Sequence, residues 1–389
     1  MDEVREDGRQ ELSGFPQGRI YPVQAAFELT PRCNFRCKMC YVRLDGSAVG
    51  RYGRELSAEE WIRMGEAAAE AGTLRLTITG GEPLVREDFP QIYQELTEMG
   101  FLITLQTNLS LLDGRVMDLI ADRPPVMIKS TLYGASEETY ERVCGVKNGL
   151  ARVRRGIENV RQAGIPLTLV STIIKDNQPE LDAIHRLAAE YGYPLQHTHN
   201  VLDSRRNENG DAASKLRIEF GSLCPEEKAK VDLKIHKPQG NPLEICGNYR
   251  FGGYWILWDG QMSLCAHMKM EKRYEPLREA GKAAEKTENS GQNINKQGIS
   301  RPDVSSFWTS GESEGQEAGG NEIERCFYRM RKDLEEQYRK SGCGECQYGQ
   351  YCTACPAVLY TRKISVGTEQ CRALAKERVQ EKRDRDRKR

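Results

Sequence analysis

The sequence has no long apolar run and no excess of charge of either sign. No apolar stretch approaches the roughly 18 residues that a membrane-spanning helix needs, and the first 20 residues are polar and charged, unlike a secretory signal. Lys and Arg together number 57, and so do Asp and Glu, so the net charge is zero. Nothing marks the whole chain as a binder of nucleic acid or of a membrane surface. We therefore expect a cytoplasmic protein with neither partner.

Cysteine is the residue that the sequence has in excess. The 389 residues include 13 cysteines, and the expected reducing compartment favours metal or redox chemistry over disulfides. Three lie together at 33, 37 and 40, five lie within 343–371, and Cys246 and Cys265 flank an aromatic stretch. Clusters of this kind indicate metal binding. Cys144 and Cys326 fall in helical apolar patterns and are expected to be small core residues.

Apolar strands alternate with helical periodicity between residues 21 and 205. Helices are expected between six strands near 23–29, 74–79, 101–107, 126–132, 166–174 and 195–202. This alternation predicts an α/β fold with a parallel sheet covered by helices. Periodicity alone does not distinguish an open barrel from a doubly wound sheet.

The rest of the chain differs in texture from this repeated core. Residues 1–20 are expected to be a flexible lead-in, 206–240 a connecting segment and 376–389 a charged tail. A second, cysteine-rich domain is expected over 241–375, with a hairpin turning at Asp259-Gly260 and a helix over 322–340. Residues 278–322 have too few apolar side chains to bury a core and are expected to form a disordered insertion.

The first cysteine cluster is a C-x3-C-x2-C motif, formed by Cys33, Cys37 and Cys40 directly after the first expected strand. Three thiolates on one loop can hold three irons of a [4Fe–4S] cluster and leave the fourth iron open. An open coordination position is what chemistry at a metal requires. A zinc site completed by a distant His or Cys is the alternative interpretation.

A second motif, Thr79-Gly80-Gly81-Glu82-Pro83, follows the second expected strand. Its two glycines allow the backbone to approach a ligand closely. The Gly81 carbonyl and the Glu82 carboxylate offer acceptors for an ammonium group. The carboxyl ends of parallel strands lie at one rim of the sheet, so this motif and the cysteine loop should lie close together.

With both motifs at one rim, the sequence resembles the radical S-adenosylmethionine (SAM) superfamily. The resemblance implies a partial (βα)6 TIM-like barrel in which the cysteine loop holds a [4Fe–4S] cluster and SAM binds its open iron. One electron would cleave SAM to methionine and a 5′-deoxyadenosyl radical, which removes a hydrogen atom from an unactivated carbon. The resemblance extends from about residue 23 to 375, apart from the expected insertion.

The resemblance also implies contacts to SAM near the ends of the strands. The motif at 79–83 would bind the amino group, Ser130 the ribose or carboxylate, and Arg142 the carboxylate. Thr172 would face the adenine or ribose. The family often has an aromatic residue just before the third cysteine, where this sequence has Met39, with Tyr41 following that cysteine. The candidate cofactor-binding residues are Thr79, Gly80, Gly81, Glu82, Pro83, Tyr41, Asn108, Ser130, Arg142 and Thr172.

The cysteines beyond residue 240 resemble the SPASM extension of radical SAM enzymes, which binds two auxiliary [4Fe–4S] clusters. The first cluster would use Cys246, Cys265 and Cys355, and the second Cys343, Cys346, Cys352 and Cys371. A fourth ligand for the first cluster could be Cys224, His236 or Asn248, or the position could stay open for a substrate. Two zinc knuckles are the alternative.

His267 is the candidate proton acceptor of this second domain. In the sulfatase-maturing relatives an aspartate after the second cysteine acts as a base, whereas here Ala266 stands in that place and His267 follows it. A hydrogen-bonded turn residue is the plainer interpretation of His267.

The resemblance predicts an oxidoreductase that matures ribosomally made peptides by forming a thioether, C–C or ether crosslink, or by oxidising a residue. Its cofactors would be SAM and three [4Fe–4S] clusters, and its partners a precursor peptide or protein, a flavodoxin- or ferredoxin-type electron donor and a separate leader-recognition protein. The alternatives are oxidation of a protein Cys or Ser, a small-molecule radical SAM reaction, an iron–sulfur electron carrier or a zinc-binding module. The substrate, the bond formed, the electron donor and the oligomeric state stay open.

Overall fold

The computed structural model describes residues 20–44, 46–199, 201–202, 215–218, 243, 246–268, 272–278 and 320–340. Five of the predicted cluster ligands, Cys343, Cys346, Cys352, Cys355 and Cys371, lie outside these residues, as do Cys224 and His236. Most of the expected insertion and the charged tail lie outside them as well.

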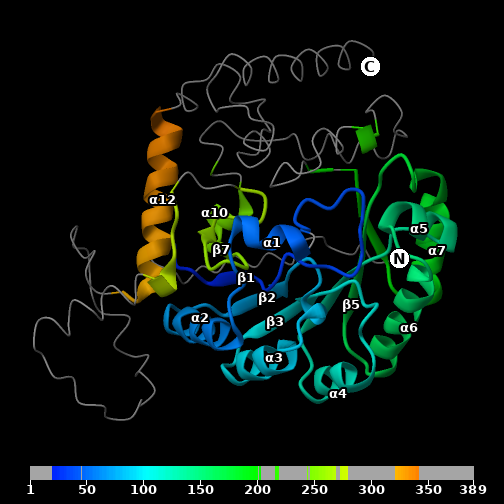
Figure 1. Ribbon diagram of the computed structural model, residues 1–389, viewed down its shortest axis with the longest axis horizontal. Coiled ribbons are helices and arrows are strands. Elements are labelled where there is room, and N and C mark those ends of the chain that lie inside the picture. The colour runs from blue at the N-terminus through cyan, green and yellow to red at the C-terminus, as the bar shows by residue number, and fades with distance from the viewer. Residues whose placement is uncertain are drawn as a thin grey trace, which may run out of the picture.

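The centre of the fold is a sheet whose eight strands are ordered β6-β5-β4-β3-β2-β1-β7-β8 (Figure 1). The six predicted strands are present as β1 (Gln24–Glu28), β2 (Arg75–Thr79), β3 (Leu102–Gln106), β4 (Met127–Thr131), β5 (Leu167–Thr172) and β6 (Leu195–Thr198). All six are parallel and each pairs with the next along the chain. In a doubly wound sheet the strand order reverses near the middle. Strands β1 to β6 follow one another without such a reversal, as they do in a barrel. The predicted partial (βα)6 barrel is confirmed.

Two further strands close off the other side of β1. Strand β7 (Gly253–Ile256) pairs with β1 in parallel, and β8 (Met262–Ser263) pairs with β7 antiparallel. The hairpin expected around Asp259-Gly260 is therefore present, and it extends the sheet of the core. In a closed barrel the last strand of the core, β6, would pair with β1. Here β1 pairs with β2 and β7 instead, so the barrel is open.

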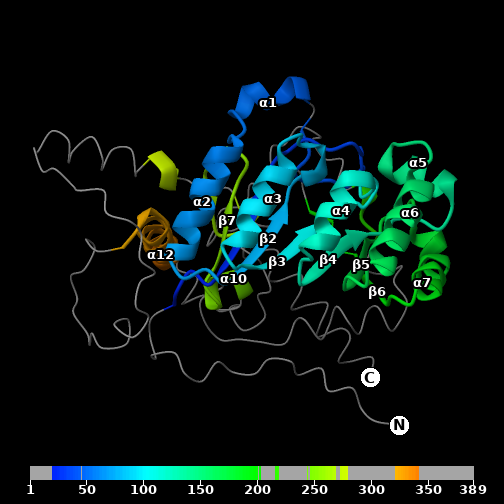
Figure 2. The same cartoon turned by 90° about the horizontal axis from the view of Figure 1, so that it is seen from below.

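Helices cover one face of the sheet, and Figure 2 shows α2, α3, α4 and α6 in a row along it. The helices of the core are α1 (Gly46–Tyr52), α2 (Ala58–Glu70), α3 (Phe89–Glu98), α4 (Gly114–Asp122), α5 (Glu137–Cys144), α6 (Gly149–Gln162) and α7 (Leu181–Glu190). Phe27 of β1 packs against Trp61 of α2, with ring centroids 5.2 Å apart. Side chains alternate along a strand, so Ile78, Leu105, Ile128 and Leu169 share this helix-covered face with Phe27.

The opposite face of the sheet, which we call the inner face, is more polar. It carries Thr79, Gln106, Lys129, Thr131 and Thr172, which the strand register places on the side away from Phe27. Thr79 Oγ1 donates a hydrogen bond to Gln106 Oε1 at 3.2 Å, as expected for neighbours on one face. The inner face therefore lines the open barrel with hydroxyl, amide and ammonium groups.

The helix boundaries follow local capping chemistry. Ser57 and Glu60 form the predicted capping box at the start of α2. Helix α5 ends at Gly145, whose φ of 64° is in the left-handed region that favours glycine. Helix α12 (Glu322–Lys340) begins at the residue where the expected insertion ends.

Helix α12 joins the barrel from the far end of the chain. It lies beside α2 in both views (Figures 1 and 2). Its Phe327 ring stands 6.0 Å from Tyr254 of β7, and Cys326 is fully buried in the core, as its apolar pattern predicts. None of the helices within the described ranges is long and apolar enough to cross a membrane.

Candidate functional site

The three-cysteine loop at 33–40 leaves β1 and rests on two neighbouring segments. The amides of Arg36 and Lys38 donate to the carbonyls of Cys144 and Val143, at 2.7 and 2.9 Å. These are among the last carbonyls of α5, which have no partner within a helix. The Lys38 ammonium also pairs with Asp176, in the loop after β5, at 2.6 Å. The loop is therefore fixed to the carboxyl-end rim of the barrel at several points.

The motif at 79–83 lies directly against the segment that leads into the cysteine loop. The Gly81 amide donates to the Thr30 carbonyl at 2.7 Å, and the Glu82 amide donates to the Arg32 carbonyl at 2.9 Å. A Cβ atom on Gly81 would lie 2.4 Å from the Arg32 carbonyl oxygen, and one on Gly80 would lie 2.7 Å from that of Thr30. Only glycine permits this close approach. The two motifs therefore lie together, as expected from their common position after parallel strands.

The Glu82 carboxylate is fully buried and accepts three hydrogen bonds from the chain. Its donors are the Leu84 amide at 3.1 Å, the Thr107 hydroxyl at 2.8 Å and the Asn108 amide at 2.7 Å. Burial raises the pKa of Glu82 to about 7, although these donors oppose the shift. The carboxylate thus joins the loops after β2 and β3.

The backbone carbonyls of the glycines are better placed to receive an ammonium group. Within the described ranges the carbonyls of Gly80 and Gly81 accept no hydrogen bond. A short 3-10 turn (η1, Pro83–Val85) begins at Pro83, directly after the motif's glycines and Glu82.

The surroundings of the three cysteines disfavour the deprotonated, thiolate form of each in the absence of metal. Burial raises the pKa of Cys33 and of Cys40, and nearby Glu82 raises that of Cys33 further. The Cys144 side chain raises the pKa of Cys37. Cationic iron is what makes adjacent buried thiolates stable, because ligand thiols must lose their protons on binding. Three thiols on one loop therefore fit three corners of a cubane cluster.

Within the described part of the chain, no three His, Cys, Asp or Glu side chains converge on a single metal ion. A cubane cluster places each thiolate on a different iron, so its ligands surround a volume and need not converge on one point.

Asn108, two residues after the end of β3, connects the cysteine loop to the barrel. Its amide nitrogen lies 3.8 Å from Cys33 Sγ and donates to Asn34 Oδ1 at 2.9 Å. Its Oδ1 accepts hydrogen bonds from the amide and the hydroxyl of Ser110. The structure thus places Asn108 against the cluster loop, where it can orient Cys33.

The strand register bears on the predicted contact between Ser130 and SAM. Ser130 lies in register with Leu169 on the helix-covered face, where its buried hydroxyl has no hydrogen-bond partner within the described ranges. Its neighbours Lys129 and Thr131 lie on the inner face, and so does Thr172. The residue that can reach a ligand in the barrel from the end of β4 is therefore Thr131, because alternate residues on a strand point to opposite faces.

Arg142 is exposed on α5 and already engaged. Its guanidinium donates to Thr139 Oγ1 at 2.7 Å and to the Asp176 carbonyl at 3.1 Å. This holds α5 to the loop after β5, beside the Lys38–Asp176 pair. Pairing with a SAM carboxylate stays a prediction for this residue.

The predicted proton acceptor His267 lies against the first cysteine loop. Its ring centroid is 4.3 Å from that of Tyr41, the residue after Cys40. The segment that carries Cys265 therefore reaches the rim where the first cluster is expected.

Cys246 and Cys265 belong to neighbouring segments of the chain. Cys246 precedes the short helix α10 (Gly247–Arg250), and the side-chain amide of Asn248 in this helix donates to the Leu264 carbonyl at 2.9 Å. Asn248 is thereby engaged next to Cys265. Whether it ligates a cluster is not determined by this contact and stays a prediction.

Two tyrosines beside the cysteine loop were not predicted from the sequence. Burial raises the pKa of Tyr133 and of Tyr140, and the nearby thiols of Cys37 and Cys144 add to both shifts. Tyr133 lies two residues after the end of β4, a position that could have marked it as a residue of the rim. Cys144 was predicted as a core residue, which it is, but its contact with Cys37 was not foreseen.

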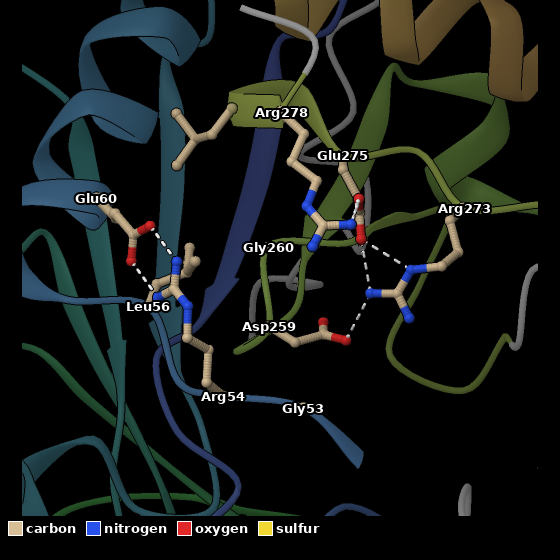
Figure 3. Close-up of a pocket in the computed structure, with 10 residues that line it drawn as sticks. Gly53, Arg54, Leu56, Glu60, Asp259, Gly260, Arg273, Glu275 and Arg278 are labelled. Carbon is tan, nitrogen blue, oxygen red and sulfur yellow. Dashed lines mark hydrogen bonds and ion pairs between the residues drawn. The ribbon is translucent and has the colours of Figure 1, made fainter. Parts of the chain in front are cut away.

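The structure also has a charged pocket with a volume of about 150 Å³ between the residues around the start of α2 and those that follow β7 (Figure 3). Arg54 and Glu60 line one side and Asp259, Arg273 and Glu275 the other. Glu60 accepts two hydrogen bonds from Arg54, which lowers the pKa of Glu60 to about 2. These charges are paired with one another, and none of the predicted site residues lines the pocket.

Comparison with known sequences agrees with the two motifs. Residues 27–188 match the model of the radical SAM superfamily. The PqqA peptide cyclase of Granulibacter bethesdensis is 30% identical over 180 residues, 46% of this chain and 47% of that protein. The AdoMet-dependent heme synthase of Methanosarcina barkeri is 28% identical over 216 residues, 55% of this chain and 61% of that protein. The chain thus spans about half the length of the curated relatives it matches.

Solved structures share the fold over a longer stretch. SuiB of Streptococcus suis, bound to S-adenosylmethionine, aligns with a TM-score of 0.56 and 15% identity over 89% of this chain and 75% of that chain. His-tagged anSMEcpe with bound AdoMet aligns with a TM-score of 0.57 and 14% identity over 92% of both chains. The match to the radical SAM superfamily thus covers residues 27–188, and the shared fold extends over most of the chain.

Proposed function

We propose that the protein is a radical SAM enzyme that modifies a ribosomally made peptide. The observation that carries the proposal is the pairing of residues 79–82 with residues 30–32, which sets two glycine carbonyls beside the three-cysteine loop. An electron carrier or zinc module has no use for ammonium acceptors at such a loop. An enzyme that holds SAM against an iron needs both together.

The chain's own residues would hold SAM in the following way. The carbonyls of Gly80 and Gly81 accept the ammonium group, and the buried Glu82 keeps their loop joined to β3. Thr131 and Lys129 reach the ligand from the inner face of β4, and Thr172 from that of β5. Tyr41 and His267 close the rim beside Cys40. These groups orient the ligand and exclude water.

The cofactors follow from the cysteines. Cys33, Cys37 and Cys40 would hold a [4Fe–4S] cluster, and Cys246 and Cys265 would belong to an auxiliary cluster. The chemistry that this cluster would supply when bound is one-electron reduction of SAM, for hydrogen abstraction from the substrate. With Cys355 for the same auxiliary cluster and Cys343, Cys346, Cys352 and Cys371 for a second one, the protein would carry three clusters. A flavodoxin- or ferredoxin-type protein would deliver the electron in the cytoplasm.

The peptide substrate is proposed from two similarities. The chain is similar to PqqA peptide cyclases, and it shares its fold with SuiB, which has been crystallised with its precursor peptide SuiA. The product would be a crosslinked or oxidised residue, and a separate protein could recognise the precursor's leader. Similarity to AdoMet-dependent heme synthases supports a small-molecule substrate as the second candidate.

The test begins with anaerobic reconstitution and measurement of iron. Three cubane clusters predict about 12 irons per chain and a single one about 4. Reduced protein should then convert SAM to 5′-deoxyadenosine. Incubation with a short peptide encoded beside the gene should give a product lighter by two hydrogen atoms. Deuterium placed in that peptide should appear in 5′-deoxyadenosine.

The outcomes separate the alternatives. SAM cleavage without modification of any peptide, together with turnover of a porphyrin precursor, would favour the small-molecule reaction. Iron binding without SAM cleavage would leave an electron carrier. A protein that binds zinc and no iron would overturn the radical mechanism.

A further inference from the structure

The carboxylate of Glu55 holds the segment that leads into the cysteine loop. Glu55 lies between α1 and α2 and belongs to neither of the two motifs. Its Oε1 accepts a hydrogen bond from the Thr30 hydroxyl at 2.5 Å and another from Arg32 Nε at 2.9 Å. Its Oε2 accepts one from Arg32 Nη2 at 2.8 Å. The Arg32 guanidinium therefore binds the carboxylate through two nitrogens, a geometry that fixes the orientation of both groups.

The two residues that Glu55 binds also receive hydrogen bonds from the glycine-containing motif. The Thr30 carbonyl accepts from the Gly81 amide at 2.7 Å, and the Arg32 carbonyl accepts from the Glu82 amide at 2.9 Å. Thr30 Oγ1 also accepts a hydrogen bond from the Arg32 amide at 3.0 Å, which ties these two residues together. The side chains of this segment thus bind Glu55, while its backbone binds the motif.

A buried guanidinium connects Glu55 back to the motif. Arg86 comes directly after η1, and its side chain is only 4% exposed. It donates to the carbonyls of Leu29 and Leu56, both at 2.9 Å, and to both carboxylate oxygens of Asp88. Its Nη1 lies 3.9 Å from Glu55 Oε2. Because a buried cation is stable only beside charged or hydrogen-bonding partners, Arg86 favours a charged carboxylate at Glu55.

The loop that carries Glu55 is itself fixed by the β7–β8 hairpin and by α2. The Leu56 amide donates to the carbonyl of Trp258, in the turn of the hairpin, at 3.0 Å. Ser57 then begins the capping box of α2. Glu55 therefore stands on a well-supported loop, from which it can hold a neighbouring segment in one position.

We propose that Glu55 is a positioning residue for SAM binding, which acts through Thr30 and Arg32. It keeps the carbonyls of these two residues where the amides of the motif meet them. It thereby sets the carbonyls of Gly80 and Gly81, the ammonium acceptors of the proposed site, beside the cysteine loop. Its contribution is to the orientation of the ligand. This inference deepens the proposed function and rests on it.

Glu55→Gln tests the inference with little change in side-chain volume. The amide has one oxygen to accept with, so it cannot bind the Thr30 hydroxyl and both nitrogens of Arg32 as the carboxylate does. Arg86 keeps Asp88 as its counter-ion in this variant, so no buried cation is left unpaired.

Glu60→Gln is the matched control. Glu60 binds Arg54 through both of its oxygens, each at 2.6 Å, in the same stretch of the chain. Its hydrogen bonds within the described ranges go to Arg54 and Ser57 and not to the segment that leads into the cysteine loop. Glutamine also preserves the capping box of α2. This variant loses a charged pair of the same kind without touching the proposed path.

The first measurement is hydrogen–deuterium exchange in anaerobically reconstituted protein without SAM. The amides of Gly81 and Glu82 exchange only when they part from the carbonyls of Thr30 and Arg32. Glu55→Gln should speed their exchange roughly tenfold, the effect of weakening contacts of this strength, and Glu60→Gln should not.

The second measurement is the rate of 5′-deoxyadenosine formation against SAM concentration. Glu55→Gln should raise the KM for SAM roughly tenfold and leave kcat within about twofold of the wild type, because it alters the positioning of SAM and not the reacting groups. A residue with a purely structural role would lower stability without this split between KM and kcat.

Arg32→Met is a second variant for the same contact. The Arg32 side chain is 42% exposed, so its loss should not prevent folding, and both backbone carbonyls of the segment remain. It should change exchange and KM in the same direction as Glu55→Gln. The double variant should add little to either single one, because the two residues act as one unit. If Glu55→Gln does not fold, Arg32→Met decides by itself.

The outcomes are distinct. Unchanged exchange and unchanged KM in the folded variants would overturn the inference, and so would equal changes in Glu60→Gln. A wild type that forms no 5′-deoxyadenosine would refute the proposed function. The exchange measurement needs no SAM, so failure of the positioning role is distinguishable from failure of the proposed function.

Discussion

The two cysteine-bearing regions that the structure describes are built in different ways. In the first, three thiols within eight residues are placed by one loop, and that loop is bonded to α5, to β2's motif and to the loop after β5. In the second, Cys246 and Cys265 lie on either side of the β7–β8 hairpin, and that hairpin joins the core through the pairing of β7 with β1. The first region can be recognised from a short motif. The second depends on how the whole chain folds.

This difference predicts different losses when a cysteine is removed, and the largest expected effect is at the first loop. Cys37→Ala should reduce SAM cleavage to background, because two remaining thiolates cannot hold the cluster that binds SAM. Cys265→Ala should leave SAM cleavage measurable while product formation stops. The measurement is 5′-deoxyadenosine by chromatography in reconstituted, reduced protein. If both variants lost 5′-deoxyadenosine formation to the same extent, the two regions would form one cofactor site and would not differ as described.

The next effect concerns the contact between the motif and the loop. Gly81→Ala places a Cβ 2.4 Å from the Arg32 carbonyl oxygen, so the backbone must move apart. We expect a loss of about 3 kcal/mol in the free energy of unfolding and a weaker affinity for SAM. Gly50→Ala is the control, because its Cβ meets nothing within 4 Å and the site is helical. That variant should be more stable by about 1 kcal/mol. Chemical denaturation and calorimetric SAM binding report both quantities.

These two regions also show how far the sequence alone could reach. The presence of the six strands follows from hydrophobic periodicity, the capping box at Ser57 from local capping chemistry, and the closeness of the two motifs from the common rim of parallel strands. The pairing of β7 with β1 could not be predicted from the sequence. The residues of β7 do not specify which strand they pair with, and β1 lies more than 200 residues earlier in the chain.

The choice of Ser130 on β4 shows a similar limit of the sequence. A strand end predicted to within a residue or two leaves undetermined which side chains point inward, since a shift of one residue exchanges the two faces. Ser130 was therefore chosen where Thr131 faces the barrel. Cys144 and Tyr133 were missed because their closeness to the loop arises from the way α5 packs.

The alternation at β4 gives a third prediction. Thr131→Ala removes a hydroxyl from the inner face and should weaken SAM binding by roughly tenfold, about 1.4 kcal/mol, the range of one hydrogen bond. Ser130→Ala removes a hydroxyl that has no partner in the described ranges, so it should leave the affinity unchanged and not lower stability. Calorimetry on reconstituted protein measures both affinities. A larger loss for Ser130→Ala would restore the contact expected from the sequence.

The smallest effect is the pH dependence that Glu82 confers on stability. Its pKa is raised by burial from the ordinary value of 4.5 to about 7, so between these values the folded chain holds a proton that the unfolded chain has released. The contribution to the free energy of unfolding is therefore full below about pH 4.5, falls as the pH rises toward 7, and then stays constant.

Glu82→Gln removes this titration, so the wild type should lose stability relative to the variant between pH 5 and pH 8. The amide of this variant cannot accept hydrogen bonds from all three donors to Glu82, so the variant should be less stable at low pH. The informative quantity is therefore the slope of stability against pH. Glu87→Gln, at an exposed neighbour, is the control and should run parallel to the wild type. Thermal unfolding at several pH values measures the difference. Parallel curves for wild type and Glu82→Gln would mean that Glu82 stays ionised in the folded protein, held by the Asn108 amide more strongly than burial opposes it.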